Sequence, residues 1–342
     1  MQKIRYFSIV LSFHLALAVH HQGNGRQQPI LNDTNGKDGA TIPIRFDDTS
    51  DSHWASDFEL IDIPSSRDGS VQKAYFYKAK STDLRPLVVS LHTWSGTYEQ
   101  KDDLALLCQQ KNVNYIHPDF RGANRSIDAC CSELAMNDID DAIRYAMENA
   151  PVDTSQLFVI GVSGGGYATL STFMKSTHPI KKFSAWASIS DLAAWHHESQ
   201  IRKNRYANDI LACTGSDTTL DTLSARDRSP LFWNTPIEKL DNTELHIYAG
   251  IYDGIQGSVP FTHSINFYNK LLSDQGITDA GSYVSDAEKL MLLERRQPLG
   301  DFGSIDRRRI CLVKESGNLR ITVFEGNHEM LTEFALEELL GK

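Results

Sequence analysis

The chain has 342 residues and a formal net charge of -10, with 44 acidic and 34 basic side chains. This acidic balance argues against nucleic acid as the main partner, because a phosphate-binding surface needs clustered Lys and Arg. Hydrophobic residues make up 41% of the chain, which is enough for one large α/β domain or two smaller ones.

The N-terminal segment has the pattern of an export signal. Residues 1–18 combine a basic start, an apolar run and Ala16-Leu17-Ala18, which fits the small-x-small cleavage rule. A buried N-terminal helix is the alternative for the same pattern. The apolar run is too short for a stable membrane span and no later segment is long enough either, so we expect no membrane span. We therefore predict an exported protein, periplasmic or extracellular.

The polar segment that follows predicts a leader and then the catalytic domain. Residues 19–52 are rich in Gln, Asn, Asp, Gly and Thr and have little apolar content, so they cannot bury a core. We predict a flexible leader there, followed by a catalytic domain over residues 53–342.

Apolar runs then alternate with helical patterns along the chain. This alternation predicts a mostly parallel, doubly wound α/β sheet with helices on both faces. The predicted strands lie near residues 71–79, 86–92, 113–120, 155–162, 181–190, 243–253, 308–316 and 319–324. A helical pattern covers residues 132–150, and segments near 195–236 and 275–312 interrupt the rhythm as helical or loop insertions near the site. The turn between the last two strands predicts a hairpin.

One serine lies inside a glycine frame, in the stretch "LFVIGVSGGGYATLSTF". Gly161, Ser163 and Gly165 spell G-x-S-x-G between an apolar strand and a helical pattern. Small residues on either side allow the sharp turn that exposes a nucleophilic serine, and the helix N-terminus favours a developing oxyanion. We interpret Ser163 as a nucleophile rather than as part of a simple tight turn.

A serine nucleophile needs a base and an acid that orients the base. Asp253 follows one predicted strand and His328 follows the last one, so the order is Ser, Asp, His, as in α/β-hydrolases. Asp191 also follows a strand and is the competing acid. We predict a triad of Ser163, Asp253 and His328.

Two backbone amides should bind the oxyanion. The amide of Gly164 is the first donor, and the second should come from the loop in "SLHTWSG". There we prefer the amide of Trp94 to that of Thr93. His92 in the same loop is expected to hold the loop in place rather than to act as a second base.

At these residues the chain resembles α/β-hydrolases of the prolyl oligopeptidase-like group. The matching pieces are "LHTWSG", "PDFRG", "GVSGGG", "GIYDGIQGSVP" and "FEGNHE", and they cover most of residues 70–335. The resemblance implies the α/β-hydrolase fold and serine-dependent acyl transfer. Two features depart from the family: Thr93 stands where the family has glycine, and the stretch from Asp253 to Pro260 is longer than D-x-x-V-P.

The expected substrate follows from the resemblance and from the tryptophans. Only about fifty mature residues precede the first strand, too few for the propeller that filters substrates in prolyl oligopeptidases. We therefore expect a carboxylesterase that acts on ester groups of carbohydrates, with Trp94 and Trp195 as candidates for sugar stacking. The alternatives are an exported, aminopeptidase-like serine peptidase and a catalytically silent binding protein on the same fold.

The cysteines suggest a disulfide rather than a metal site. The sequence has neither C-x-x-C nor H-E-x-x-H, so we expect no metal and no cofactor. The count of five leaves at least one cysteine without an intramolecular partner. In an exported protein we predict that Cys213 pairs with Cys130 or Cys131, because both loops should lie near the same end of the sheet.

Overall fold

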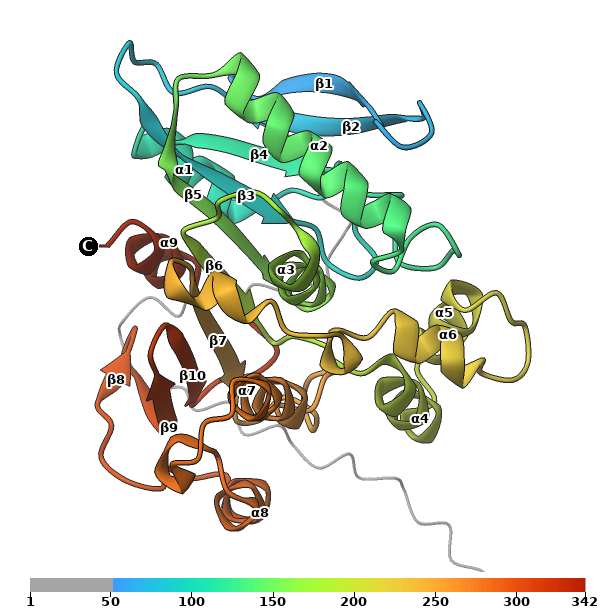
Figure 1. The fold of residues 1–342 in the computed structure, drawn as a ribbon, viewed down its shortest axis with the longest axis vertical. Coiled ribbons are helices and arrows are strands. Elements are labelled where there is room, and N and C mark those ends of the chain that lie inside the picture. The colour runs from blue at the N-terminus through green and yellow to red at the C-terminus, as the bar shows by residue number, and fades with distance from the viewer. Residues whose placement is uncertain (1–51, 342) are drawn as a thin grey trace, which may run out of the picture. The chain divides into compact units, whose positions relative to one another are not determined.

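A ten-stranded sheet organises residues 52–341, the part of the chain that this computed structural model describes (Figure 1). The strand order is β1-β2-β4-β3-β5-β6-β7-β10-β9-β8. The strands are β1 (Glu59–Pro64), β2 (Val71–Tyr77), β3 (Arg85–Leu91), β4 (Asn114–Pro118), β5 (Val152–Val162), β6 (Lys182–Trp186), β7 (Glu244–Gly250), β8 (Ser304–Ile305), β9 (Arg308–Ser316) and β10 (Leu319–Phe324). The predicted export signal and nearly all of the predicted leader lie outside the described residues.

The centre of the sheet is parallel and its two sides are antiparallel. Strands β4, β3, β5, β6, β7 and β10 pair in parallel. On one side β2 pairs antiparallel with β4 and with β1, and on the other β9 pairs antiparallel with β10 and with β8. The predicted mostly parallel α/β sheet and the closing hairpin are thus confirmed.

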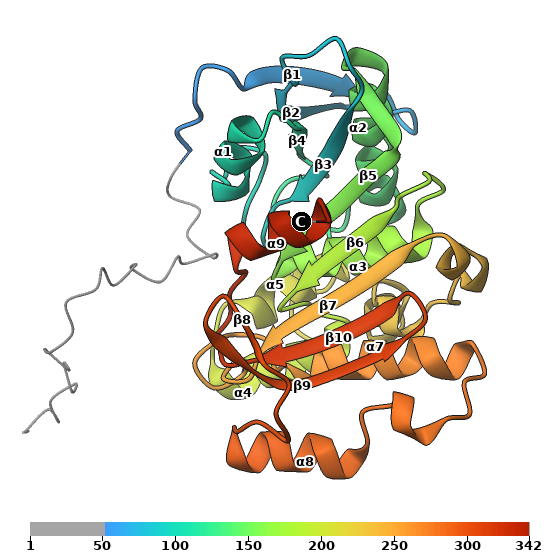
Figure 2. The same cartoon turned by 90° about the vertical axis from the view of Figure 1, so that its left-hand side faces the viewer.

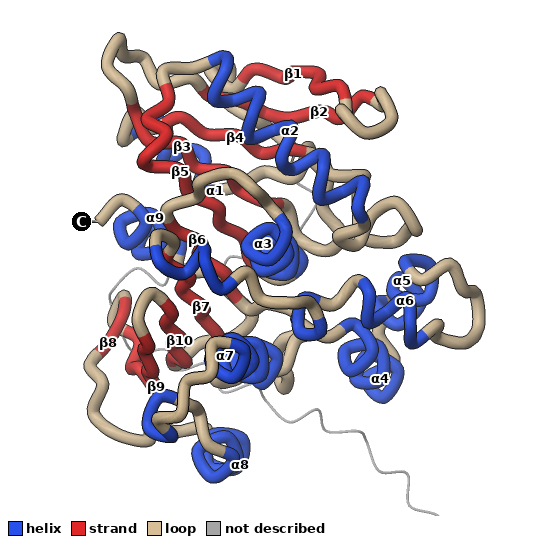
Figure 3. Tube along the Cα trace, in the orientation of Figure 1, coloured by secondary structure: helices blue, strands red, loops and turns tan. Residues whose placement is uncertain are grey.

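Helices cover both faces of the sheet, as Figures 2 and 3 show. Helices α1 and α9 lie on one face, and α2, α3 and α7 lie on the other. The remaining helices belong to the insertions. The bounds are α1 (Asp103–Gln110), α2 (Glu133–Asn149), α3 (Gly164–Lys175), α4 (Leu192–Arg202), α5 (Tyr206–Cys213), α6 (Thr222–Asp227), α7 (Thr262–Asp274), α8 (Asp286–Arg295) and α9 (Thr332–Leu339). None of the helices within residues 52–341 is both long and apolar enough to cross a bilayer.

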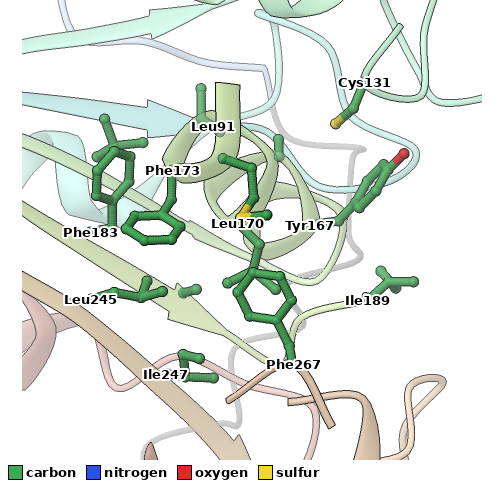
Figure 4. Close-up of a cluster of buried hydrophobic side chains, with 14 of the residues drawn as sticks. Leu91, Cys131, Tyr167, Leu170, Phe173, Phe183, Ile189, Leu245, Ile247 and Phe267 are labelled. Atoms are coloured by element: carbon green, nitrogen blue, oxygen red, sulfur yellow. The ribbon is translucent and has the colours of Figure 1, made fainter. Parts of the chain in front are cut away.

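The larger core surrounds α3, whose residues Gly164–Met174 are all buried. A helix that is buried on every side needs apolar partners on every side. Leu170 and Phe173 of α3 meet Phe183 of the sheet and Phe267 of α7, as Figure 4 shows. This packing fixes the helix that begins directly after Ser163.

The two insertions lie close to the segments that the sequence predicted. Helices α4, α5 and α6 lie between β6 and β7, and α8, β8 and β9 lie between α7 and β10. Helix α8 begins with a capping box in which Ser285 and Glu288 exchange hydrogen bonds between side chain and backbone. Figure 1 shows α4–α6 grouped together beyond one end of the central strands.

A disulfide between Cys130 and Cys213 connects the segment before α2 to the end of α5. The two Cα atoms lie 6.0 Å apart, although the residues are separated by 83 positions in the sequence. The predicted pairing of Cys213 is confirmed, and Cys130 is the partner. Cys108, Cys131 and Cys311 are buried free thiols.

Replacing Cys213 by serine should destabilise the protein. A bridge that closes a long loop restricts the unfolded chain, and its loss costs about 2–5 kcal/mol of the free energy of unfolding. Urea unfolding without reductant should show this loss. Dithiothreitol should lower the midpoint of the wild type but not that of Cys213→Ser, and equal sensitivity of the two proteins would contradict the bridge.

Candidate active site

Ser163 occupies a strained turn between β5 and α3. Its backbone has φ 59° and ψ -120°, a region that non-glycine residues rarely adopt. A Cβ atom on Gly161 would lie 2.5 Å from the Gly165 carbonyl, and one on Gly165 would lie 2.1 Å from the Leu91 oxygen. The two glycines are therefore required by close backbone approach. This is the geometry of a nucleophile elbow.

His328 and Asp253 form a direct pair. Nδ1 of His328 lies 2.7 Å from Oδ2 of Asp253. The other carboxylate oxygen, Oδ1, accepts hydrogen bonds from the amides of Gly254 and Val259 at 2.9 and 3.1 Å. Asp253 is only 1% exposed, so its charge is held by these groups rather than by water. With Nδ1 donating to the carboxylate, Nε2 of His328 is the nitrogen that can accept a proton.

The loops that carry these two residues are joined to each other. After β7, the amide of Ile251 donates to the carbonyl of Phe324 at the end of β10, and the amide of Tyr252 donates to the carbonyl of Gly326 just beyond it. In the sheet β5, β6, β7 and β10 are successive neighbours and run parallel. Their carboxyl ends therefore share one edge, where open α/β sheets bind ligands.

Asp191, the other candidate for the acid of the triad, caps a helix instead. Its carboxylate accepts hydrogen bonds from the amides of Ala193 and Ala194 at the start of α4. It is thus the N-cap of that helix. The carboxylate that contacts His328 is that of Asp253.

The loop after β3, which was expected to supply the second oxyanion donor, brings the Trp94 amide against Gly164. A Cβ atom on Gly164 would lie 2.2 Å from the Trp94 nitrogen, so the two backbones touch. The Thr93 amide donates instead to Oε1 of Gln100 at 3.0 Å. This hydrogen bond corrects the prediction that Thr93 is a possible donor, because its N–H is already used inside the loop.

His92 supports the same loop. Its ring stacks on Phe120 at 3.8 Å, and its Nδ1 lies 2.9 Å from the Thr93 carbonyl. Nε2 of His92 lies 3.6 Å from Asp119. Burial raises the pKa of Asp119, but the neighbouring His92 ring and hydrogen bonds from two backbone amides outweigh burial and lower it. The expected loop-holding role matches these contacts.

The tryptophan side chains do not form the stacking surface that the sequence suggested. Trp94 and Trp195 are 1% and 0% exposed, and their rings pack edge to face at 4.7 Å. The Trp94 indole donates to Asp209 and the Trp195 indole donates to the Ser258 carbonyl. Neither ring leaves a free face for a sugar, because each is enclosed by the protein. This burial corrects their assignment as stacking residues.

Comparison with known proteins fits this geometry. A model of the prolyl oligopeptidase family matches residues 103–287, just over half of the chain. The chain belongs to the prolyl oligopeptidase family. The matched range contains Ser163 and Asp253. No curated protein sequence matches the chain.

Solved structures of the same group share the fold. An acylaminoacyl peptidase bound to a chloromethyl ketone has a TM-score of 0.53 and 17% identity, over 82% of this chain and 40% of its own. Prolyl oligopeptidase B from Galerina marginata has a TM-score of 0.52 and 17% identity, over 64% of this chain and 32% of its own. A puromycin-hydrolyzing peptidase of Mycobacterium tuberculosis has a TM-score of 0.51 and 15% identity, over 82% of this chain and 38% of its own. This chain therefore spans less than half the length of these three structures.

In this member of the prolyl oligopeptidase family, helix α4 holds the long loop that runs from Asp253 to Pro260. Nη1 of Arg202 donates to the Gly257 carbonyl at 2.9 Å, and Nη2 donates to the Gly254 carbonyl. A Cβ atom on Gly257 would lie 2.2 Å from Oδ1 of Asp253 and 2.5 Å from Cβ of His328. The additional residues of the loop are therefore packed directly on the Asp253–His328 pair.

Two supporting residues were not found from the sequence. Gln100 fixes Thr93, and Arg202 fixes the loop after Asp253. The unusual length of that loop was the only signal that it needs support, and nothing in the sequence marks Arg202 as the support. Within residues 52–341, no cluster of His, Cys, Asp or Glu has the arrangement of a metal site.

Replacing Arg202 by glutamine should lower kcat about 10- to 100-fold with a smaller change in KM. The reason is that a small displacement of the loop after Asp253 moves Asp253 and therefore misplaces His328. Arg202→Lys should restore part of kcat, since an ammonium can reach one carbonyl, and Lys203→Gln serves as an exposed control. Steady-state kinetics on a 4-nitrophenyl ester measures the effect. A wild-type kcat in Arg202→Gln would remove this positioning role.

Proposed function

We propose that this chain is a serine peptidase that cleaves short peptides through an acyl-enzyme on Ser163. The observation that carries the proposal is the 2.7 Å contact between His328 and the buried carboxylate of Asp253. The pair stands at the carboxyl ends of β7 and β10, at the same edge of the sheet as Ser163 after β5. The strained turn at Ser163 supports the same interpretation, because such strain persists where function requires it.

The proposed mechanism is acyl transfer in two halves. Oγ of Ser163 attacks the scissile carbonyl carbon while Nε2 of His328 takes the hydroxyl proton. Asp253 stabilises the imidazolium, and the amides of Gly164 and Trp94 bind the oxyanion. When the tetrahedral intermediate collapses, the C–N bond breaks and the leaving amine takes the proton from His328. Water then attacks the acyl-enzyme with His328 again as base, and Ser163 is released.

Peptide substrates are favoured over carbohydrate esters for two reasons. The family is that of prolyl oligopeptidases, and the solved structures of similar fold include an acylaminoacyl peptidase and a puromycin-hydrolyzing peptidase. The carbohydrate interpretation relied on open tryptophan faces, and the rings of Trp94 and Trp195 are enclosed. A catalytically silent protein is disfavoured by the intact Asp253–His328 pair.

Aminoacyl anilides should be better substrates than polysaccharide esters. A triad with an oxyanion hole hydrolyses activated esters whatever its natural substrate, so ester cleavage alone does not discriminate. We expect the ratio of kcat/KM for the best anilide to that for acetylated or methylated polysaccharides to exceed one. A ratio below one would instead favour the hypothesis of a carboxylesterase that acts on carbohydrate esters. Absence of labelling by a fluorophosphonate probe would favour the silent protein.

Export remains part of the proposal. Residues 1–18 have the composition of a signal peptide. The Cys130–Cys213 disulfide supports the idea, because such bridges persist in oxidising compartments. Sequencing of the mature N-terminus should find cleavage after Ala18, and an intact Met1 on the exported or cell-bound protein would contradict it.

A further inference from the structure

A small polar cavity of about 190 Å³ opens beside the oxyanion loop. Three segments distant in sequence meet there: the loop after β3, the loop after β4 and the start of α5. The lining residues are Trp94, Ser95, Ala123, Asn124, Arg125, Arg205 and Asp209. We call this cavity the arginine pocket.

The arginine pocket is connected to the proposed oxyanion hole through Trp94. The amide of Trp94 lies against Gly164, its carbonyl accepts the Asn124 amide at 2.8 Å, and its indole donates to Asp209 at 3.3 Å. A group bound in the pocket therefore touches the residue whose amide faces Gly164. The pocket and the proposed oxyanion hole thus share the residue Trp94.

Positive charge dominates the pocket. Arg205 uses one nitrogen to donate to Ser95 Oγ at 2.5 Å, and its guanidinium lies over the Tyr206 ring. The guanidinium of Arg125 makes no hydrogen bond or ion pair within residues 52–341. Asp209 is the one carboxylate in the lining, and no salt bridge within the described residues ties it to either arginine. Two guanidinium groups with unused donors thus face one carboxylate.

The carboxylate of Asp209 already has a partner inside the protein, because one of its oxygens accepts the hydrogen bond from the Trp94 indole. Burial raises its pKa, although the hydrogen bond from Trp94 and the charges of Arg205 and Arg125 act in the opposite direction. An ammonium group in this pocket would meet two like charges, and an apolar group would leave guanidinium donors without partners. An anion satisfies the donors that the protein itself leaves open.

We propose that the arginine pocket binds a carboxylate carried by the substrate close to the scissile carbonyl. The proposal names the substrate class of the peptidase site and rests on the function proposed above. Planar guanidinium groups bind carboxylates through paired hydrogen bonds. A pocket of this size is smaller than the roughly 300–1,000 Å³ of sites for whole drug-sized ligands, so it fits one charged group. The carboxylate is either the C-terminus of a short peptide or an acidic group on the acyl side.

Matched substrate pairs test the proposal and distinguish these two sources. The first pair is 4-nitrophenyl hemiglutarate and 4-nitrophenyl pentanoate, which differ in a carboxylate on the acyl side. The second pair is alanyl-alanine and its C-terminal amide. We expect kcat/KM to favour the carboxylate in one pair by about 10- to 100-fold, the range for hydrogen bonds to a charged group. High salt should reduce this preference.

Arginine variants link the preference to the pocket. Arg125→Gln and Arg205→Gln should each reduce the carboxylate preference about tenfold. Arg144→Gln, which removes a charge from the second half of α2, should keep it. Arg125 is exposed, so its variant should fold, and circular dichroism checks this. Lack of any carboxylate preference in both pairs, or a preference that Arg125→Gln leaves unchanged, would overturn the proposal.

A binding measurement separates this proposal from the peptidase function. Calorimetry with glutarate on the Ser163→Ala protein reports the pocket without turnover, and Arg125→Gln in that background should weaken glutarate binding about tenfold. Hydrolysis of neutral 4-nitrophenyl pentanoate reports the serine mechanism alone. Loss of hydrolysis with retained glutarate binding would remove only the peptidase function. Hydrolysis without any glutarate binding would remove only the arginine pocket.

Discussion

Ser163→Ala and His328→Ala are each expected to lower kcat by about four orders of magnitude or more. Alanine at position 163 removes the oxygen that forms the acyl-enzyme. Alanine at position 328 removes the group that takes its proton, so Ser163 would have to attack as an un-ionised hydroxyl. The residual rate in either variant comes from the oxyanion donors and from substrate binding.

The combination of these two substitutions provides a further test. Residues that act as one unit lose most of the rate with the first substitution, so the double variant should be little slower than either single one. Ser155→Ala and His197→Ala are matched controls, since both side chains are exposed and neither contacts the proposed triad. The measurement is kcat on purified, folded protein. Activity within tenfold of the wild type in either single variant would remove the triad assignment.

The expected loss at Ser163 is a loss of chemistry rather than of folding. The turn at this residue has positive φ, and alanine meets the same backbone strain as serine. The glycines around it, not its hydroxyl, allow β5 and α3 to approach. Ser163→Ala should therefore keep the thermal midpoint of the wild type and lose labelling by a fluorophosphonate.

Local patterns were sufficient to predict the central fold and the elbow. Apolar runs of strand length that alternate with helical patterns require a parallel sheet, and the structure has one from β4 to β10. The G-x-S-x-G spacing at Ser163 is also local, because the residues that must be small lie two positions away. Strand β1 was not predicted, since Glu59–Pro64 is a short edge strand with only two buried side chains.

Long-range contacts were not accessible from the sequence. Trp195 has a side chain that could stack on a sugar. In the structure, α4 buries this ring against Trp94 and directs its indole N–H to the Ser258 carbonyl. Whether an indole faces solvent depends on how an insertion packs, and local spacing does not encode that. The same holds for Arg125 and Arg205, which meet in one pocket from segments eighty positions apart in the numbering. The disulfide was within reach because Cys213 had few possible partners.

The second large effect is expected at the acid, where Asp253→Asn should lower kcat about 10³- to 10⁴-fold. An amide can present its NH₂ group to Nδ1 of His328, and this favours the tautomer with the proton on Nε2. That tautomer cannot take the proton of Ser163. The neutral amide also fails to stabilise the imidazolium that forms during attack.

Asp191→Asn is the matched comparison, because Asp191 follows the neighbouring strand β6 and was the competing acid. Its carboxylate caps α4, and asparagine is nearly as good an N-cap as aspartate. The Asp191→Asn variant should therefore keep kcat within a few-fold of the wild type and change the free energy of unfolding by less than about 1 kcal/mol. Steady-state kinetics and urea unfolding on both variants decide the matter. If Asp191→Asn were the more damaging change, the acid would belong at the end of β6, and the 2.7 Å contact of Asp253 with His328 would be only structural.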